Sequence, residues 1–278
     1  MDVRLAEDPA EFAERAGGFL ALERYSANVI AVHLGEVRAG RRPLAEDALW
    51  ITLESGGSVV GAAMHTPPHP LFLPRLGPGA ADALADVLSS HRRPLTGVSG
   101  EQETVLAFRE RWAFLGGSRG RLRTSMRLYV LGDLRVPEVP GRARLGTLEE
   151  ASLAAGWLRA FDTEAMPAAP AAEVAEVARH LLAARRLWMW ESDGEVVALA
   201  GVSEPAAGVA RVGPVYTPPG QRRRGYGSAV TAAASSAALR GGADDVVLYT
   251  DLANPTSNSI YQAIGYRPDH DAGEWVLD

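Results

Sequence analysis

A short glycine-rich turn carries the clearest chemical signal in this sequence. Arg222, Gly225 and Gly227 immediately precede residues 226–240, a run of small residues typical of a helix. The first N–H groups of a helix have no intrahelical acceptor, and glycines let a ligand approach the backbone closely. The helix dipole favours an anion there, and the three arginines that begin at Arg222 add positive charge. The turn therefore predicts a pyrophosphate site, with an exposed basic turn at a helix start as the alternative reading.

Composition excludes several other chemistries. The chain has 278 residues and a net charge of −6, and all 28 of its Lys+Arg positions are arginine. Without lysine there is no Walker-type phosphate loop and no Schiff base, and without cysteine there is no thiol nucleophile, disulfide or iron–sulfur cluster. The negative charge argues against binding to nucleic acid. His65 and His69 have no third ligand beside them in the sequence, so we expect a surface loop there and no metal site.

No segment predicts membrane insertion or export. The sequence contains no run of about 18 apolar residues, and its first residues are acidic and lack the layout of a signal peptide. We therefore expect a cytoplasmic protein that does not bind membranes.

The elements around the turn can be predicted from local patterns. A strand-like run, 209–217, comes before the turn and is interrupted at Gly213-Pro214, where a regular ladder cannot continue. A strand over 245–250 and a helix over 257–264 come after it. Earlier in the chain, Thr147 and Glu150 form a capping-box pattern. The remaining elements expected in this half are a helix over 148–160, a second over 170–185 and a β-hairpin over 187–200.

The first half follows a similar plan. Residues 49–63 match the 187–200 hairpin with one gap, including its E-S-x-G turn. Helical periodicity over 8–18 and 20–39 precedes this hairpin, and Asp8 is a candidate N-cap. The Pro- and Gly-rich stretch 136–146 is the expected linker. We therefore expect two domains, 1–135 and 147–278.

The second half resembles the GNAT superfamily of acetyl-CoA-dependent N-acetyltransferases. Arg222, Gly225 and Gly227 match its Arg/Gln-x-x-Gly-x-Gly/Ala signature, VGPVYTPP (212–219) resembles its bulged strand, and NPTSNSIYQAIGY (254–266) resembles its Asn-to-Tyr segment. The resemblance covers about residues 140–278. It implies an α/β (α+β) fold of two tandem GNAT-like domains, each with a mixed, mostly antiparallel twisted sheet flanked by helices.

The resemblance also implies roles for individual residues. Backbone groups of Val215 and Thr217 would pair with the pantetheine arm of acetyl-CoA, and backbone amides from Arg223 to Ser228 would hold its pyrophosphate. Tyr261 would protonate the departing thiolate, although it could instead pack the helix onto the sheet. The cofactor-binding residues expected on this basis are Val215, Tyr216, Thr217, Arg222, Arg223, Arg224, Gly225, Tyr226, Gly227, Ser228, Asn254 and Asn258.

Amine attack on a thioester also requires a proton acceptor. Glu204, at the end of the second hairpin, is the candidate, and solvation at a strand end is its alternative role. Asp162 and Glu164 lie in the expected loop between the helices that flank the acceptor site in this family. Their carboxylates could attract a cationic amine or simply face solvent.

The first half lacks the cofactor features. Its counterpart of the glycine turn is PRLGPGAAD (74–82), and its counterpart of the Asn-to-Tyr segment has neither residue. Residues 116–120 fit the hydrolase pattern G-x-S-x-G but follow a helix and precede a strand, the reverse of the required order, so we interpret them as a turn. The first half is therefore expected to be a degenerate copy.

The sequence predicts an N-acetyltransferase that moves an acetyl group from acetyl-CoA to a primary amine of a small molecule or peptide. Direct attack in a ternary complex is expected, because no cysteine is present to carry an acyl group. The alternative is a non-catalytic CoA-binding regulatory or interaction protein.

Overall fold

The structure, a computed structural model, describes residues 1–92, 94–165 and 171–277. Two compact units divide it. The first contains residues 1–128 together with 269–278, and the second contains residues 129–268. The last residues of the chain, 269–278, therefore belong to the first unit. The expected domains, 1–135 and 147–278, had placed them in the second.

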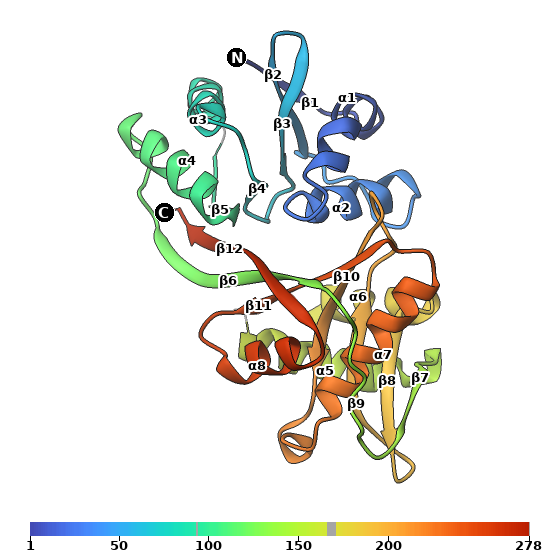
Figure 1. The fold of residues 1–278 in the computed structure, drawn as a ribbon. Coiled ribbons are helices and arrows are strands. Elements are labelled where there is room, and N and C mark those ends of the chain that lie inside the picture. The colour runs from blue at the N-terminus through green and yellow to red at the C-terminus, as the bar shows by residue number, and fades with distance from the viewer. Residues whose placement is uncertain (93, 166–170, 278) are drawn as a thin grey trace. The chain divides into compact units, whose positions relative to one another are not determined.

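The same order of elements occurs twice, β-α-α-β-β-β-α-β-α-β, which matches the tandem architecture expected from the sequence (Figure 1). The first series is β1 (Asp2–Ala6), α1 (Pro9–Leu22), α2 (Asn28–Arg38), β2 (Leu49–Ser55), β3 (Ser58–His65), β4 (Leu71–Leu73), α3 (Ala80–Ser90), β5 (Gly97–Glu101), α4 (Gln102–Phe114) and β6 (Arg121–Leu131). The second is β7 (Arg142–Leu145), α5 (Ala151–Ala165), α6 (Ala171–Ala183), β8 (Leu187–Ser192), β9 (Glu195–Val202), β10 (Val209–Tyr216), α7 (Tyr226–Arg240), β11 (Asp245–Asp251), α8 (Pro255–Ala263) and β12 (Tyr266–Val276).

In the first unit the strand order is β1-β2-β3-β4-β5-β12. Its strands are antiparallel except for β4 and β5, which run parallel. Residues 272–276 of β12 pair antiparallel with β5 and so supply the first unit with a strand from the end of the chain. Two buried clusters lie on its sheet, one with α1 and α2 and the other with α3 and α4.

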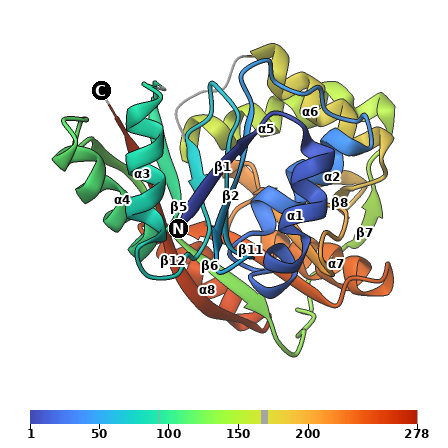
Figure 2. The ribbon, with the colours of Figure 1, turned by 90° about the horizontal axis from the view of Figure 1, so that it is seen from above.

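In the second unit the order is β11-β10-β9-β8-β7, with only β10 and β11 parallel. One buried cluster packs α7 and α8 against the sheet, and another packs α5 and α6 against it (Figure 2). The unit thus has three layers, with the sheet between one pair of helices, α7 and α8, and the other, α5 and α6.

Local chemistry explains several helix starts. Asp8 accepts a hydrogen bond from the Ala10 N–H at 2.8 Å, as its N-cap position predicts. Glu150 reaches back to the Thr147 N–H at 2.9 Å, which confirms the capping box. No helix in the described part of the chain has the length and apolarity to cross a membrane.

Four expectations about local structure were wrong. His65 does not lie in a surface loop, because it is the buried last residue of β3, whereas His69 is exposed. Residues 161–164 are not a loop, because α5 continues to Ala165. Residues 142–145 form β7 inside the stretch expected to be a linker, since this edge strand pairs with β8. The helix expected over 20–39 is interrupted between Leu22 and Asn28. The first residue of the helix expected over 170–185, Pro170, lies outside the described residues.

Candidate functional site

The bulge in β10 opens an edge of the second sheet. Strand β10 pairs with β11 only over Val209–Arg211, and its register with β9 shifts between Val212 and Val215. A Cβ on Gly201 of β9 would lie 2.9 Å from the Gly213 carbonyl oxygen, so this close approach requires glycine. Beyond Arg211, β10 therefore follows β9, and among the described residues its β11 side has no ladder partner.

A set of unsatisfied backbone amides lies just past this edge, at the start of α7. Gly225 is the N-cap residue, with a φ of 81° and no side-chain cap. Among the residues that the structure describes, none accepts a hydrogen bond from the N–H groups of residues 223–228. These groups form an array of donors at the positive end of a 15-residue helix.

Two glycines lie in this array of amides, and a side chain at either position would meet a neighbouring residue. A Cβ on Gly225 would lie 2.9 Å from Val139 Cγ2, and the positive φ adds strain for any other residue. A Cβ on Gly227 would lie 3.3 Å from Thr217 Oγ1. The donors, the glycines and the arginine-rich turn fit the pyrophosphate of acetyl-CoA.

The three arginines of the turn are exposed and differ in their contacts. Arg222 donates from Nε to the Thr217 carbonyl oxygen at 2.9 Å. Its Nη2 lies 2.9 and 2.6 Å from the two carboxylate oxygens of Glu164. Arg224 donates to Gln221 Oε1 at 3.2 Å, whereas the side chain of Arg223 makes no hydrogen bond or ion pair with the residues that the structure describes. Of the three arginines, Arg222 therefore contacts another helix in the described part of the chain, α5.

Two tyrosines expected at the site are buried. Tyr226 packs in the core with its hydroxyl 3.4 Å from Ser192 Oγ, so only its backbone faces the amide array. Tyr216 is 6% exposed and donates to Glu164 Oε1 at 3.2 Å. Burial, followed by the charge of Glu164, raises the pKa of Tyr216.

Tyr261 of α8 is also buried and belongs to the same apolar cluster as Val212 of the bulge. Val215 packs against this cluster, and the Tyr266 ring lies 6.2 Å away, edge-on. Burial raises the pKa of Tyr261 to about 12. The hydroxyl therefore keeps its proton at neutral pH, which both a proton donor and a packing residue require.

The two asparagines have structural contacts. Asn254 is the N-cap of α8 and accepts from the Ser257 N–H at 3.0 Å. Asn258 accepts from Tyr129 Oη at 2.9 Å and donates to the carbonyls of Asp251 and Asn254 at 2.8 and 2.7 Å. Because these bonds occupy the amide of Asn258, its expected role toward a cofactor stays a prediction.

Glu204 follows the end of β9 and contacts the Arg186 guanidinium. Val202, the last residue of β9, is opposite Val212 at one end of the bulge, and Glu204 follows two residues later. The Glu204 side chain is 49% exposed. A carboxylate that is engaged by a cation is a weak proton acceptor, so the role expected for Glu204 stays a prediction.

The first unit differs from the second at the equivalent strand. Strand β4 stays paired with β5 to its last residue, Leu73, opposite Gly100. A Cβ on Gly100 would lie only 1.8 Å from the Leu73 carbonyl oxygen, so the two backbones are in contact. Gly79 still begins α3 in the left-handed conformation. Parallel pairing spans three residues in both units, but β4 ends at Leu73 whereas β10 continues to Tyr216. The first copy has thus kept a helix start without the strand extension beside it.

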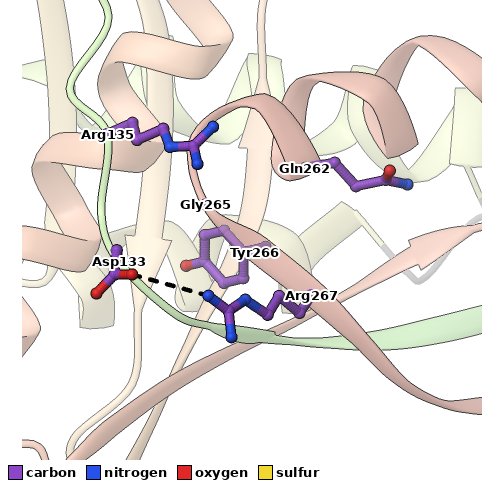
Figure 3. Close-up of a pocket in the computed structure, with 6 residues that line it drawn as sticks. All are labelled: Asp133, Arg135, Gln262, Gly265, Tyr266 and Arg267. Carbon is purple, nitrogen blue, oxygen red and sulfur yellow. Dashed lines mark ion pairs between the residues drawn. The ribbon is translucent and has the colours of Figure 1, made fainter.

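A small cavity lies elsewhere in the second unit, where α8 meets β12 (Figure 3). It has a volume of about 80 Å³ and is lined by Asp133, Arg135, Gln262, Gly265, Tyr266 and Arg267. Arg267 faces Asp133 across it at 3.7 Å. Ligand pockets usually measure about 300–1,000 Å³, so this cavity is too small for a cofactor. No metal-binding cluster occurs among the described residues.

Comparison with known proteins assigns the second unit to a family. The Acetyltransferase (GNAT) family pattern matches residues 153–266, and this segment is a domain of that family. The sequence matches no curated protein.

Solved structures extend the likeness to the whole chain. An acetyltransferase of the GNAT family from Colwellia psychrerythraea has a TM-score of 0.61 and 13% identity, with 100% of both chains covered. A GCN5-related N-acetyltransferase from Sphaerobacter thermophilus has a TM-score of 0.61 and 16% identity, with 98% of this chain and 94% of that chain covered. A tandem GNAT protein from the clavulanic acid biosynthesis pathway has a TM-score of 0.56 and 17% identity, over 99% and 98%. The chain therefore has a tandem GNAT fold.

Proposed function

We propose that the second unit transfers an acetyl group from acetyl-CoA to a primary amine of a small molecule or peptide. The observation that supports this most is the adjacency of two features, the open edge of β10 and the free amides at the start of α7. An extended arm can pair with the first while its pyrophosphate meets the second. By its resemblance to the GNAT acetyltransferases, we expect this chain to hold acetyl-CoA with these two features.

The residues of the chain would then act as follows. Backbone groups of Val215 and Thr217 bind the pantetheine arm and place the thioester near the bulge. The amine nitrogen forms a bond to the acetyl carbon while the carbon–sulfur bond breaks. Tyr261 gives its proton to the departing sulfur, and the proton lost by the amine leaves to water or to a carboxylate. Glu204 would serve as that carboxylate only after release from Arg186.

The pairing of Glu204 with Arg186 also favours a second candidate, a non-catalytic CoA-binding protein. Such a protein would use the same amides and bulge without a proton acceptor. The two candidates differ in one observable, the release of free CoA thiol in the presence of amines.

Calorimetric titration with acetyl-CoA tests the binding step, with Gly227→Glu as the control. One site per chain that the variant lacks is the expected result, and two sites would show that the first unit also binds. No binding would contradict both candidates. A thiol-release assay with a panel of primary amines then separates them, because only the enzyme consumes acetyl-CoA in an amine-dependent way.

A further inference from the structure

Arg222 connects the residue that follows β10 to helix α5. Its Nε donates to the Thr217 carbonyl oxygen at 2.9 Å, at the end of the open edge of β10. Its Nη2 contacts both oxygens of Glu164, at 2.9 and 2.6 Å. The guanidinium thus points toward α5, although the free amides of the turn that follows would hold the phosphates.

Glu164 and Tyr216 both contact a cationic side chain, that of Arg222. Trp157, Phe161 and Glu164 share one face of α5, at i, i+4 and i+7. The Trp157 ring lies 6.1 Å from that of Tyr216, whose hydroxyl donates to Glu164. The Arg222 guanidinium carbon lies 5.7 Å from the centre of the Tyr216 ring. The Glu164 carboxylate and the Tyr216 ring thus both contact one cation, a combination that would also suit an organic cation.

The same guanidinium cannot serve both partners fully. Its Nη2 contacts Glu164, and a pyrophosphate bound at the amides of residues 223–228 would carry a greater charge and attract the guanidinium more strongly. The side chains of Arg222 and Glu164 are 42% and 46% exposed, so their ion pair is weak enough for a ligand to break. Once Arg222 turns to the phosphates, Glu164 remains beside Tyr216 without its cation.

We propose that Glu164 is the specificity-determining carboxylate for a cationic amine acceptor, and that Arg222 occupies its place until acetyl-CoA binds. This inference rests on the proposed function. Arg222 is an internal substitute for the acceptor's ammonium group, and acetyl-CoA binding exposes the carboxylate. Acetyl-CoA therefore binds first, and the amine binds well only to the loaded enzyme.

The test compares Glu164→Gln with the wild type in two measurements. The glutamine amide keeps an oxygen for the Tyr216 hydroxyl but removes the charge that holds Arg222. Acetyl-CoA should bind the variant about two- to fivefold more tightly by calorimetry at low salt, since a half-exposed pair no longer has to break. The KM of an amine found in the thiol-release panel should rise about fivefold or more at saturating acetyl-CoA, with kcat changed less.

Tighter binding of acetyl-CoA together with a higher KM for the amine distinguishes this proposal from general damage to the fold, because such damage would weaken the binding of both substrates. Glu176→Gln on α6 removes an equal charge from an exposed position nearby in the chain and should change neither value. Glu164→Asp keeps the charge but shortens its reach, and should give intermediate values. Melting temperatures of all variants check folding.

Each outcome decides a defined part of the proposal. Unchanged or weaker acetyl-CoA binding by Glu164→Gln would overturn it, since Arg222 would then not be restrained by Glu164. Tighter acetyl-CoA binding with an unchanged amine KM would overturn the role of Glu164 toward the acceptor. A wild type that binds no acetyl-CoA would instead contradict the proposed function. As a readout independent of turnover, the ¹⁵N resonance of Arg222 Nε should move in the wild type on addition of acetyl-CoA and already be moved in Glu164→Gln.

Discussion

Replacing Gly227 by glutamate separates cofactor binding from stability, because the two should change in opposite directions. Gly227 is the second residue of α7, and its backbone is not in the left-handed region. A side chain there needs no backbone strain and meets only Thr217 Oγ1, at 3.3 Å from the Cβ. Loss of a helical glycine contributes about 0.5–1 kcal/mol to stability, and an acidic group in the first turn adds about 0.3–1 kcal/mol.

The same carboxylate would lie among the amides expected to hold the pyrophosphate. Two unit charges about 5 Å apart repel by about 1 kcal/mol in bulk water and about 3 kcal/mol at an effective dielectric constant of 20. For one phosphate charge, that range corresponds to about a 5- to 150-fold loss of affinity. The carboxylate also competes for the free N–H groups, so acetyl-CoA binding should become undetectable at moderate concentrations.

Calorimetry with acetyl-CoA and thermal unfolding measure the two effects in parallel. Gly227→Gln adds nearly the same volume without the charge, so it should bind more tightly than Gly227→Glu, while Gly227→Ala should keep most of the affinity. If Gly227→Glu binds acetyl-CoA as well as the wild type, the pyrophosphate does not lie at the start of α7, and the assignment of the site fails.

Three further predictions address other parts of the molecule. Tyr261→Phe should lower kcat at least tenfold at pH 7 and leave the Kd for acetyl-CoA within about twofold, and unchanged turnover would leave Tyr261 only a packing role. Gly77→Glu places the same charge in turn 74–79 of the first unit and should leave acetyl-CoA affinity unchanged, because β4 ends at Leu73 and has no extension like the end of β10; a large loss would show that the first copy binds the cofactor. Burial, followed by the charge of Arg42, lowers the pKa of His33 from 6.5 to about 4, so the unfolded chain takes up a proton before the folded protein does. Stability should therefore fall as the pH drops from 6.5 toward 4, and His33→Gln should flatten that slope in urea titrations.

Local patterns predicted much of the fold. Residues 226–240 form α7 with the expected bounds, because a left-handed glycine starts the helix and Gly241 ends it. The two hairpins occur as expected, extended by two residues each at their second strands, to His65 and Val202. Such elements depend on neighbours in sequence, so spacing and turn residues are sufficient to find them.

Long-range pairing could not be predicted in the same way. Nothing in residues 272–276 indicates that they pair with β5, more than 170 residues earlier. The extension of α5 through Glu164 was missed for a related reason, since its acidic and polar end resembles a loop until Tyr216 and Arg222 provide partners. Gly201 was not singled out either, because only the bulge opposite it explains why a Cβ cannot fit there.

The strand that residues 272–276 give to the first unit has a consequence for how the protein is made. Residues 1–128 leave the ribosome without the partner for one side of β5. At about 5–20 residues per second, the remaining 150 residues take roughly 8–30 s to synthesise. During that time β5 exposes an unpaired edge, a template for wrong association. Truncated proteins that end near residue 128 should therefore aggregate, and fusing the peptide of residues 269–277 to them should restore their solubility.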